Sequence, residues 1–460
     1  MEGARSVARV EETALQELCE RLRKQFGVTG ASVAVVHRGE LSVAAAGIAN
    51  RDLDQPMRTS TLMQIGSTTK VYTAAMLLQL AALDRIDIDA PVAEVLPEFT
   101  LASGSEASRI TPRHLMSMTS GLDNGPYTDT GRGDDCVERY VGLLGEIPLL
   151  FAPGSSYSYS NASTVISGLI IERLTGACWD EALASLILEP AGFAESVTLA
   201  EQLPYHHVAV GHEPGVNGSV IAQNWTFSRG MGPSGSTLAT TAADLARFGL
   251  LMLNGGVSDN GKRILAESVV RALQSPQVDV PARWFADQWC VGAYRKVWDG
   301  TEVFGHGGTT MQSSSTLVWI PNLDVTVAVI VNNPSLGYPF AHALLDELLL
   351  TEFSIKKPKR PVHDPNASFD AAQYVGEYRT LETNYRVTGG DTGQLLLTMD
   401  SHALFSDGVI ESELQPIGDH RFLAVDDRVT TFHNWDLAFS DITDGKARLL
   451  HNGGFAAARV

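Results

Sequence analysis

A serine and a lysine stand three residues apart at the start of an apolar stretch. Ser67 and Lys70 open a run of good helix formers that continues to Leu80 and is interrupted by Gln79. This pattern predicts a buried helix, too short and too interrupted to span a bilayer. Positions i and i+3 share a helix face, so the ammonium of Lys70 can lie beside the Ser67 hydroxyl. Together with the unpaired N–H groups and positive dipole end of a first helical turn, the pair could form a nucleophilic serine site.

The Ser-x-x-Lys pair needs partners, because the motif is common by chance and serine is a frequent helix N-cap. Two other stretches could supply them. Tyr159 and Asn161 lie in a predicted loop between helices, and His306 is followed by two glycines immediately before a predicted strand. Each stretch alone also fits a plainer interpretation, since a loop tyrosine often fills a packing gap and His-Gly-Gly often forms a turn.

The composition is that of a globular protein with an acidic charge balance. The chain has 460 residues, which exceeds one ordinary domain, so we expect two. It has 34 lysines and arginines and 53 aspartates and glutamates, which gives a formal net charge of −19. This balance argues against nucleic acid or an anionic membrane as the main partner, because both require a basic surface. It places no limit on a small substrate.

We expect no export signal, membrane anchor, metal or cofactor. Residues 11–26 indicate an amphipathic helix and not a secretory signal. The four cysteines lack metal or redox spacing, which favours reduced thiols in a cytoplasm. His206, His207 and His212 lack metal-ligand partners, so we expect them at the surface. The expectation is a cytoplasmic protein without metal or cofactor.

The order of predicted elements is that of a mixed α/β chain. Apolar runs bounded by turn residues predict strands, and longer runs of helix formers predict helices. The expected strands cover residues 31–37, 41–48, 314–320 and 325–331. The expected helices or helical turns cover residues 92–99, 111–118, 162–174, 242–253 and 338–353, and the expected loops or turns cover 121–135, 152–161 and 233–237.

The composition changes sharply at residues 357–362, which are rich in lysine and proline. Beyond this point short alternating strands are broken by glycine and aspartate, a pattern typical of a small all-β barrel or sandwich. The strands expected there cover residues 374–379, 395–399, 422–425 and 447–451. We therefore predict a catalytic domain at 1–355, a linker at 356–363 and a β domain at 364–460.

The three motifs, in this order, resemble the serine β-lactamase and penicillin-binding protein superfamily. The Tyr-x-Asn and His-Gly-Gly forms are similar to its class C and DD-peptidase-like branch. The flanking stretches 110–122, 153–154, 232–236 and 240–245 agree, and the resemblance covers about residues 10–355. It implies an α/β fold in which an antiparallel sheet is flanked by helices and joined to a helical subdomain.

The resemblance assigns a role to each motif residue. Ser67 would attack a carbonyl and form an acyl-enzyme, while Lys70 and Tyr159 would share the work of removing its proton. An ammonium near a phenol favours the charged phenolate, so Lys70 would lower the pKa of Tyr159. Asn161 would hold Lys70 and contact an amide of the substrate.

The resemblance also implies a substrate cradle built mainly from backbone. The N–H groups of Ser67 and Thr309 would form the oxyanion hole, and the strand at Gly307 and Gly308 would pair with the substrate as an additional strand. Gly235 would also contact the substrate. No metal takes part in this scheme.

Three positions depart from the superfamily's common pattern. His306 replaces the lysine of the penicillin-recognising motif, and it would keep hydrogen-bonding capacity with a charge that depends on pH. Met118 stands where relatives often carry histidine, and residues 311–313 lack a glycine that relatives often carry. The last change lies beside the expected oxyanion strand and bears on substrate preference.

The C-terminal stretch resembles the lipocalin-like module of some D-stereospecific aminopeptidases and of stand-alone penicillin-binding-protein-type thioesterases. Residues 374–378 and 456–460 carry this resemblance. Arg448 or Arg459 could reach a substrate carboxylate, and Arg459 is our candidate for substrate binding, although a solvent-facing arginine is the plainer alternative.

These observations predict a serine acyl-enzyme catalyst for peptide-like acyl groups that contain a D-residue. The leading hypothesis is a trans-acting thioesterase that releases and macrocyclises a nonribosomal peptide, which could arrive on a carrier protein. A D-stereospecific aminopeptidase, amidase or esterase is the alternative enzyme. A catalytically silent relative that binds peptide or β-lactam is the alternative outside enzymes. The sequence leaves the oligomeric state open.

Overall fold

The computed structural model describes residues 10–104, 106–215, 218–225, 227–390, 393–403, 406–430 and 436–460. The chain divides into two compact units, each built from three segments. The first unit comprises Met1–Gln79, Trp179–Arg271 and Val297–Lys357, and the second comprises Leu80–Cys178, Ala272–Lys296 and Pro358–Val460. Segments far apart in the sequence therefore contribute to each unit.

The first unit is organised around antiparallel strands in the order β3-β2-β1-β14-β13-β12. Every residue of β1, β13 and β14 is buried, because these strands are apolar runs covered on both faces. The strands are β1 (Gly30–His37), β2 (Glu40–Asn50), β3 (Gln55–Pro56), β12 (Thr301–Thr309), β13 (Ser314–Ile320) and β14 (Val325–Val331).

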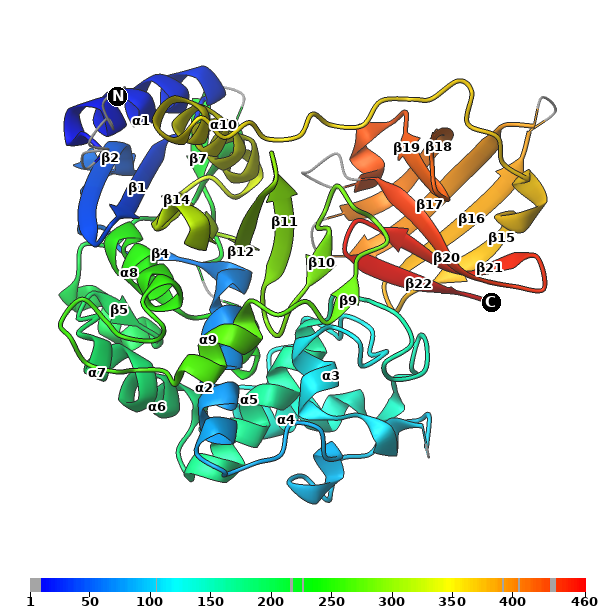
Figure 1. The fold of residues 1–460 in the computed structure, drawn as a ribbon, viewed down its shortest axis with the longest axis horizontal. Helices are drawn as coiled ribbons and strands as arrows, with labels where there is room; N and C mark the ends of the chain where they lie inside the picture. Colours follow the sequence, from blue (N-terminus) through cyan, green and yellow to red (C-terminus); the bar gives the residue numbers. More distant parts are fainter. Residues whose placement is uncertain are drawn as a thin grey trace, which may run out of the picture. The chain divides into compact units, whose positions relative to one another are not determined.

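Helices cover both faces of these strands (Figure 1). A Cβ on Gly249 of α8 (Ala242–Leu253) would meet Thr326 Oγ1 at 2.2 Å, and one on Gly337 of α10 (Pro334–Phe353) would meet Val331 Cγ2 at 2.7 Å. Thr326 and Val331 are five residues apart on β14, so they point to opposite faces. Helix α1 (Glu12–Phe26) packs beside α10.

The second unit contains a helical part and a closed barrel. Its helix α5 (Asn161–Thr175) is buried at every position from Asn161 to Ile171, which explains why its sequence has no polar stripe. The helical part also contains α3 (Pro112–Met116), α4 (Cys136–Gly142), β9 (Val278–Asp279), β10 (Gln288–Trp289) and the first residues of β11 (Tyr294–Trp298).

Eight antiparallel strands close the C-terminal barrel, which confirms the predicted all-β domain. The barrel closes where Tyr378 pairs with Arg459. Its strands are β15 (Gly376–Arg379), β16 (Thr383–Gly389), β17 (Leu395–Ala403), β18 (Ser406–Gly418), β19 (Arg421–Ala424), β20 (Leu437–Thr443), β21 (Lys446–Asn452) and β22 (Phe455–Arg459).

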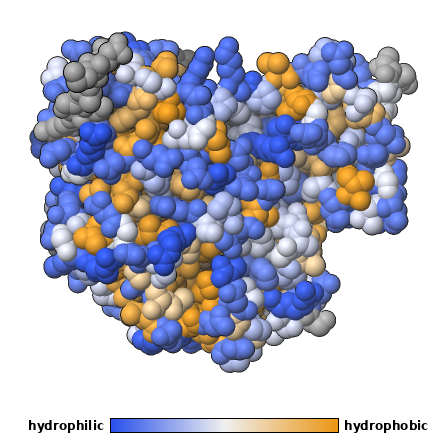
Figure 2. Space-filling view, in the orientation of Figure 1, coloured by the Kyte–Doolittle hydropathy of each residue, from blue (hydrophilic) through white to orange (hydrophobic). Residues whose placement is uncertain are grey.

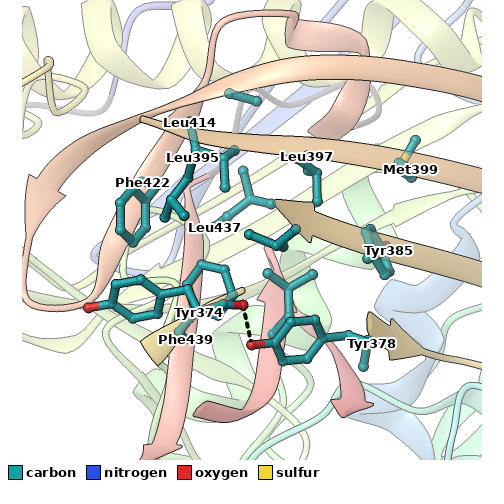
Figure 3. Close-up of a cluster of buried hydrophobic side chains, with 14 of the residues drawn as sticks. Tyr374, Tyr378, Tyr385, Leu395, Leu397, Met399, Leu414, Phe422, Leu437 and Phe439 are labelled. Atoms are coloured by element: carbon teal, nitrogen blue, oxygen red, sulfur yellow. Dashed lines mark hydrogen bonds between the residues drawn. The ribbon is translucent and has the colours of Figure 1, made fainter. Parts of the chain in front are cut away.

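Aromatic and aliphatic side chains fill the barrel. Tyr374, Tyr378, Phe422 and Phe439 pack together with leucines from the neighbouring strands (Figure 3). The hydroxyl of Tyr378 donates to the carbonyl of Tyr374 at 2.7 Å, so this buried phenol is satisfied. The interior is a packed core.

The nucleophile helix and several short elements complete the fold. They are α2 (Thr69–Ala82), α6 (Trp179–Leu183), α7 (Glu189–Ala191), α9 (Glu267–Leu273), β4 (Met63–Gln64), β5 (Ser196–Val197), β6 (His212–Gly215), β7 (Gly218–Ile221) and β8 (Ala239–Thr240). Within the described ranges, no helix has the length and apolar character needed to cross a bilayer. The surface drawn in Figure 2 interleaves hydrophilic and hydrophobic residues.

Some predictions from the sequence were wrong in detail. The helix expected at 92–99 is a single 3-10 turn at Val92–Glu94, since Pro97 cannot continue a helix. The expected surface position of His212 is also wrong. Its side chain is fully buried beside Asn332, and its Nε2 accepts the backbone N–H of Arg51 at 3.2 Å.

Candidate active site

Ser67 lies on a 3-10 turn, Gly66–Thr68, that leads directly into α2. The sequence placed it in the first turn of the helix itself, so the helix begins two residues later than expected. Lys70 follows in α2 and donates from Nζ to Ser67 Oγ at 3.1 Å and to the carbonyl of Ser234 at 2.6 Å. The amine and the hydroxyl are adjacent, which is the proximity that the three-residue spacing predicts.

Burial changes the protonation of Lys70. The side chain is fully buried, and the loss of hydration lowers its pKa well below the usual value of 10.5. A neutral lysine amine carries a lone pair, so it can accept the proton of a hydroxyl beside it. Ser67 is half-buried. The first unit therefore contains a serine next to a potential general base.

His306 lies within strand β12, and the sequence was wrong to place the His-Gly-Gly motif before the strand. The strand starts at Thr301, and its pairing with β13 begins at Phe304 and includes His306 opposite Leu317. The ring Nδ1 lies 2.5 Å from the carbonyl oxygen of Gly307, which requires Nδ1 to carry the proton and to donate.

Burial first, and the neighbouring Lys70 second, lower the pKa of His306 to about 3, although the bond to Gly307 opposes the shift. The imidazole is therefore neutral near physiological pH. The change of charge expected for His306 therefore falls well below physiological pH, because the ring is more completely buried than its sequence neighbours reveal.

Glycines let β12 and a neighbouring turn approach the nucleophile. A Cβ on Gly308 would lie 2.7 Å from the backbone nitrogen of Ser67, and one on Gly235 would lie 2.1 Å from the carbonyl oxygen of Gly66. Gly66 itself has a φ of +54°, and a Cβ there would meet the nitrogen of Thr309 at 2.6 Å. Sequence reasoning missed Gly66, although its place directly before the serine was the available signal.

Thr309 and Gly307 flank Gly308 on the same strand. Gly307 is not crowded, since an added Cβ would have one neighbour within 4 Å, the carbonyl oxygen of Ser315 at 3.7 Å. The close approach of Thr309 to Gly66 puts its backbone against the nucleophile turn. The roles of Ser67 and Thr309 in an oxyanion hole, and of Gly307, Gly308 and Gly235 in substrate binding, stay predictions.

Tyr159 lies in the second unit in an aromatic cluster. Its ring meets Phe455 edge-on at 5.5 Å and Trp289 at 5.8 Å between ring centroids. Its backbone N–H donates to the carbonyl of Gly454 at 2.8 Å. Gly454 lies in the turn between β21 and β22 and Phe455 begins β22, so the barrel contributes directly to the surroundings of Tyr159.

Met118 supports the same segment from the other side. Its carbonyl accepts the N–H of Ser158 at 2.9 Å, and its sulfur accepts the N–H of Ser160 at 3.4 Å. Its φ of +60° is rare for a residue with a side chain, so the surroundings hold it in that conformation. The departure from the family pattern at Met118 therefore lies at a backbone support for Tyr159.

Asn161 begins α5, directly after its N-cap, and is not a loop residue as expected. Ser160 caps the helix by accepting the N–H of Ser163 at 3.1 Å. The side-chain Nδ2 of Asn161 donates to the hydroxyl of Tyr127 at 3.2 Å. Sequence reasoning missed Tyr127, which stands in a stretch rich in glycine, aspartate and threonine.

Arg459 is bound within the barrel. Its guanidinium donates to the carbonyls of Ala447, Val375 and Gln373 and to the hydroxyl of Tyr378. We therefore assign Arg459 a structural role at the barrel closure and leave it out of the functional proposal. The side chain of Arg448 is about half exposed, and a guanidinium nitrogen lies 3.8 Å from Asp444.

A family model described as Beta-lactamase matches residues 15–350. The chain belongs to the beta-lactamase family. This beta-lactamase-family chain is 33% identical over 369 residues to penicillin-binding protein 4 of Amycolatopsis lactamdurans, a match that covers 79% of the chain and 96% of that protein. It is 30% identical over 354 residues to esterase EstB of Burkholderia gladioli, covering 69% of the chain and 86% of the esterase.

Solved structures extend the likeness to the barrel. The crystal structure of SurE with D-Leu has a TM-score of 0.80 and 26% identity, covering 98% of the chain and 99% of SurE. The octameric penicillin-binding protein homologue from Pyrococcus abyssi has a TM-score of 0.65 and 20% identity, covering 94% and 97%. The beta-lactamase-family chain is therefore a serine hydrolase with the family's fold and an additional C-terminal barrel.

Proposed function

We propose that this serine hydrolase transfers a peptide-like acyl group through an acyl-enzyme on Ser67. The observation that carries the proposal is the buried amine of Lys70, lowered in pKa and 3.1 Å from Ser67 Oγ. Lys70 takes the hydroxyl proton as Ser67 attacks the carbonyl, and the leaving group departs with a proton. No metal or cofactor is required for these steps.

The family's motifs supply the remaining roles. In this proposal Tyr159 shares proton transfer with Lys70, and Asn161 contacts an amide of the substrate. His306, neutral at physiological pH, contributes hydrogen bonding without charge. Backbone N–H groups of Ser67 and Thr309 stabilise the oxyanion, a contribution of about 3 kcal/mol per donor in comparable sites.

For the acyl acceptor, our leading proposal is the amine of the same peptide. The enzyme would then act as a trans-acting thioesterase that releases a nonribosomal peptide and closes it into a ring. The resemblance of residues 374–378 and 456–460 to the module of stand-alone thioesterases supports this choice. The match to SurE, which was solved with D-Leu, covers 98% of the chain with the barrel included. A D-residue near the scissile bond follows from the same support.

Water is the alternative acceptor. An esterase, amidase or D-aminopeptidase would use the same serine and lysine and release a linear acid. The 30% identity to esterase EstB supports this alternative. Both proposals place the reaction in the cytoplasm, with the acyl group delivered by a carrier protein or as a free peptide derivative.

The test uses a D-configured peptidyl thioester with a free N-terminal amine, mixed with wild type and with Ser67→Ala. Intact-protein mass spectrometry should show a transient gain of the acyl mass in wild type alone, since only Ser67 can carry the ester. A cyclic product identifies the amine as acceptor, and a linear acid identifies water. If neither this substrate nor a fluorophosphonate or β-lactam probe labels wild type, the acyl-enzyme proposal is wrong.

A further inference from the structure

A short segment of the second unit, residues 123–127, surrounds Asn161 with hydrogen bonds. The backbone N–H of Asn161 donates to Asn124 Oδ1 at 3.1 Å, and the next N–H, of Ala162, donates to the Asn124 carbonyl at 3.0 Å. A backbone N–H can only donate, so it fixes which end of the Asn124 amide is the oxygen. The Nδ2 of Asn124 must then lie on the other branch.

Both amide side chains meet at one phenol oxygen. Asn124 Nδ2 donates to the Tyr127 hydroxyl at 3.3 Å, and Asn161 Nδ2 donates to the same atom at 3.2 Å. A tyrosine oxygen has two lone pairs, and the two amides use both. Burial raises the pKa of Tyr127 above its usual value of 10, so the oxygen remains a neutral phenol.

This arrangement orients the amide of Asn161. With Nδ2 directed to Tyr127, the carbonyl oxygen of the side chain occupies the other branch of the planar amide. That oxygen is an acceptor, the kind of atom needed to receive an N–H from an ammonium or from a peptide. If the Asn161 amide were rotated by 180°, its Nδ2 would take the position of the carbonyl oxygen. The Nδ2 group and the incoming N–H, both donors, would then face each other.

The segment is itself held in place on two sides. Asp123 is buried, and its carboxylate accepts the N–H of Asn124 at 2.6 Å and that of Leu381 at 2.7 Å, in the turn between β15 and β16 of the barrel. Its carbonyl accepts the hydroxyl of Ser160, the N-cap of α5, at 2.8 Å. Tyr127 therefore acts from a segment tied to both the helix and the barrel.

We propose that Tyr127 is a positioning residue for acyl transfer, which it serves by fixing the orientation of the Asn161 amide. The proposal rests on the function proposed above, in which Asn161 contacts the substrate. Tyr127 touches neither the acyl group nor the nucleophile in this scheme, and its effect passes through Asn161.

The test compares Tyr127→Phe with a matched control, Tyr140→Phe. Both changes remove one phenol oxygen and keep the ring, but the Tyr140 hydroxyl has no hydrogen-bond partner among the described residues. The substrate is the D-configured peptidyl thioester, and the measurements are kcat/KM and the midpoint of thermal unfolding. We expect Tyr127→Phe to lower kcat/KM about tenfold, because the amides of Asn161 and Asn124 both lose their acceptor. Tyr140→Phe should leave kcat/KM unchanged.

A double-mutant cycle with Asn161→Ala separates positioning from a general structural effect. If Tyr127 acts through Asn161, Tyr127→Phe lowers kcat/KM in wild type but by less than about twofold in the Asn161→Ala background. An equal loss in both backgrounds overturns the proposal and leaves the acyl-enzyme function standing. Full activity of Asn161→Ala itself removes the role of Asn161 in the proposed function, whatever the result for Tyr127.

Discussion

At the scale of single residues, burial sets the protonation of the groups around the nucleophile. Lys70 and His306 are both almost completely removed from water, and both have a lowered pKa for that reason first. A neutral amine can act as a base towards Ser67, whereas an ammonium cannot. The Ser-x-x-Lys spacing places an amine beside the hydroxyl, but the amine can act as a base only because the surrounding chain excludes water from it.

Lys70→Met should stabilise the protein at neutral pH while abolishing acylation. Because the folded pKa of Lys70 is lowered, the unfolded chain binds more protons below pH 10.5, and the stability of wild type rises with pH. We expect the variant to gain about 1 kcal/mol at pH 7. The difference should then shift towards wild type by about 1.4 kcal/mol per pH unit, so that wild type becomes the more stable protein well before pH 10. Urea unfolding across this range measures the effect.

Ser67→Ala serves as the control, because it removes activity without removing a titrating group, so its stability should follow the pH dependence of wild type. A stability difference between Lys70→Met and wild type that stays constant from pH 7 to pH 10 would contradict the neutral amine. It would indicate that the buried charge is retained and compensated by its hydrogen bonds.

At the scale of elements, the site in the first unit depends on how closely strand β12 approaches the nucleophile turn. The two glycines of the motif differ in this respect. A methyl group on Gly308 would overlap the backbone at Ile65 and Ser67, while one on Gly307 would meet nothing closer than 3.7 Å. The second glycine is therefore a steric requirement, and the first is not.

Gly308→Ala should lower the free energy of unfolding by about 1–3 kcal/mol, because the strand or the turn must shift to admit the methyl group. Gly307→Ala is the matched comparison, and its midpoint of thermal unfolding should stay near that of wild type. Equal loss in the two variants would mean that flexibility of the motif, and not the space at Gly308, limits stability.

The stability of the barrel depends on the hydrogen bonds of Arg459. Arg459→Met would leave three carbonyls and the Tyr378 hydroxyl without this donor, and we expect a loss of about 1–3 kcal/mol in stability. Arg448→Met, on the exposed side, should change the midpoint of unfolding little. A higher KM with unchanged stability in Arg459→Met would instead support the predicted contact with a substrate carboxylate.

At the scale of the whole molecule, each unit contains a buried histidine that acid should charge. His306 in the first unit and His451 in the barrel both have a pKa lowered to about 3, mainly by burial. The unfolded chain protonates histidine near pH 6.5, so the folded state binds fewer protons between pH 6.5 and pH 3. Acid should therefore weaken both units.

The expected loss is about 1.4 kcal/mol per pH unit for each histidine, once the pH is below 6.5. Between pH 6.5 and pH 4.5, the free energy of unfolding of His451→Gln should fall less steeply than that of wild type, by about 1.4 kcal/mol per pH unit. Urea unfolding at four or five pH values measures the difference. Parallel curves for the two proteins would show that His451 is protonated in the folded barrel.

The sequence was sufficient for the order and type of most elements. The helix at 242–253 and the strands at 314–320 and 325–331 have the predicted bounds, because their apolar patterns and turn residues are local signals. The motifs with their flanks also indicated the family that the comparison confirms. The pair of Ser67 and Lys70 was readable because i and i+3 are neighbours on any helical turn.

Only the tertiary structure decided which side chains are buried away from water and which residues each one contacts. Four findings depend on contacts between segments that are distant in the chain. They are the neutral state of His306, the burial of His212, the hydrogen bonds of Arg459 within the barrel and the hydrogen bond between Asn161 and Tyr127. A residue's own sequence neighbours do not specify such contacts, since desolvation and hydrogen bonding depend on what packs against it. The sequence therefore determined the catalytic motifs, and the fold determined their protonation and their supports.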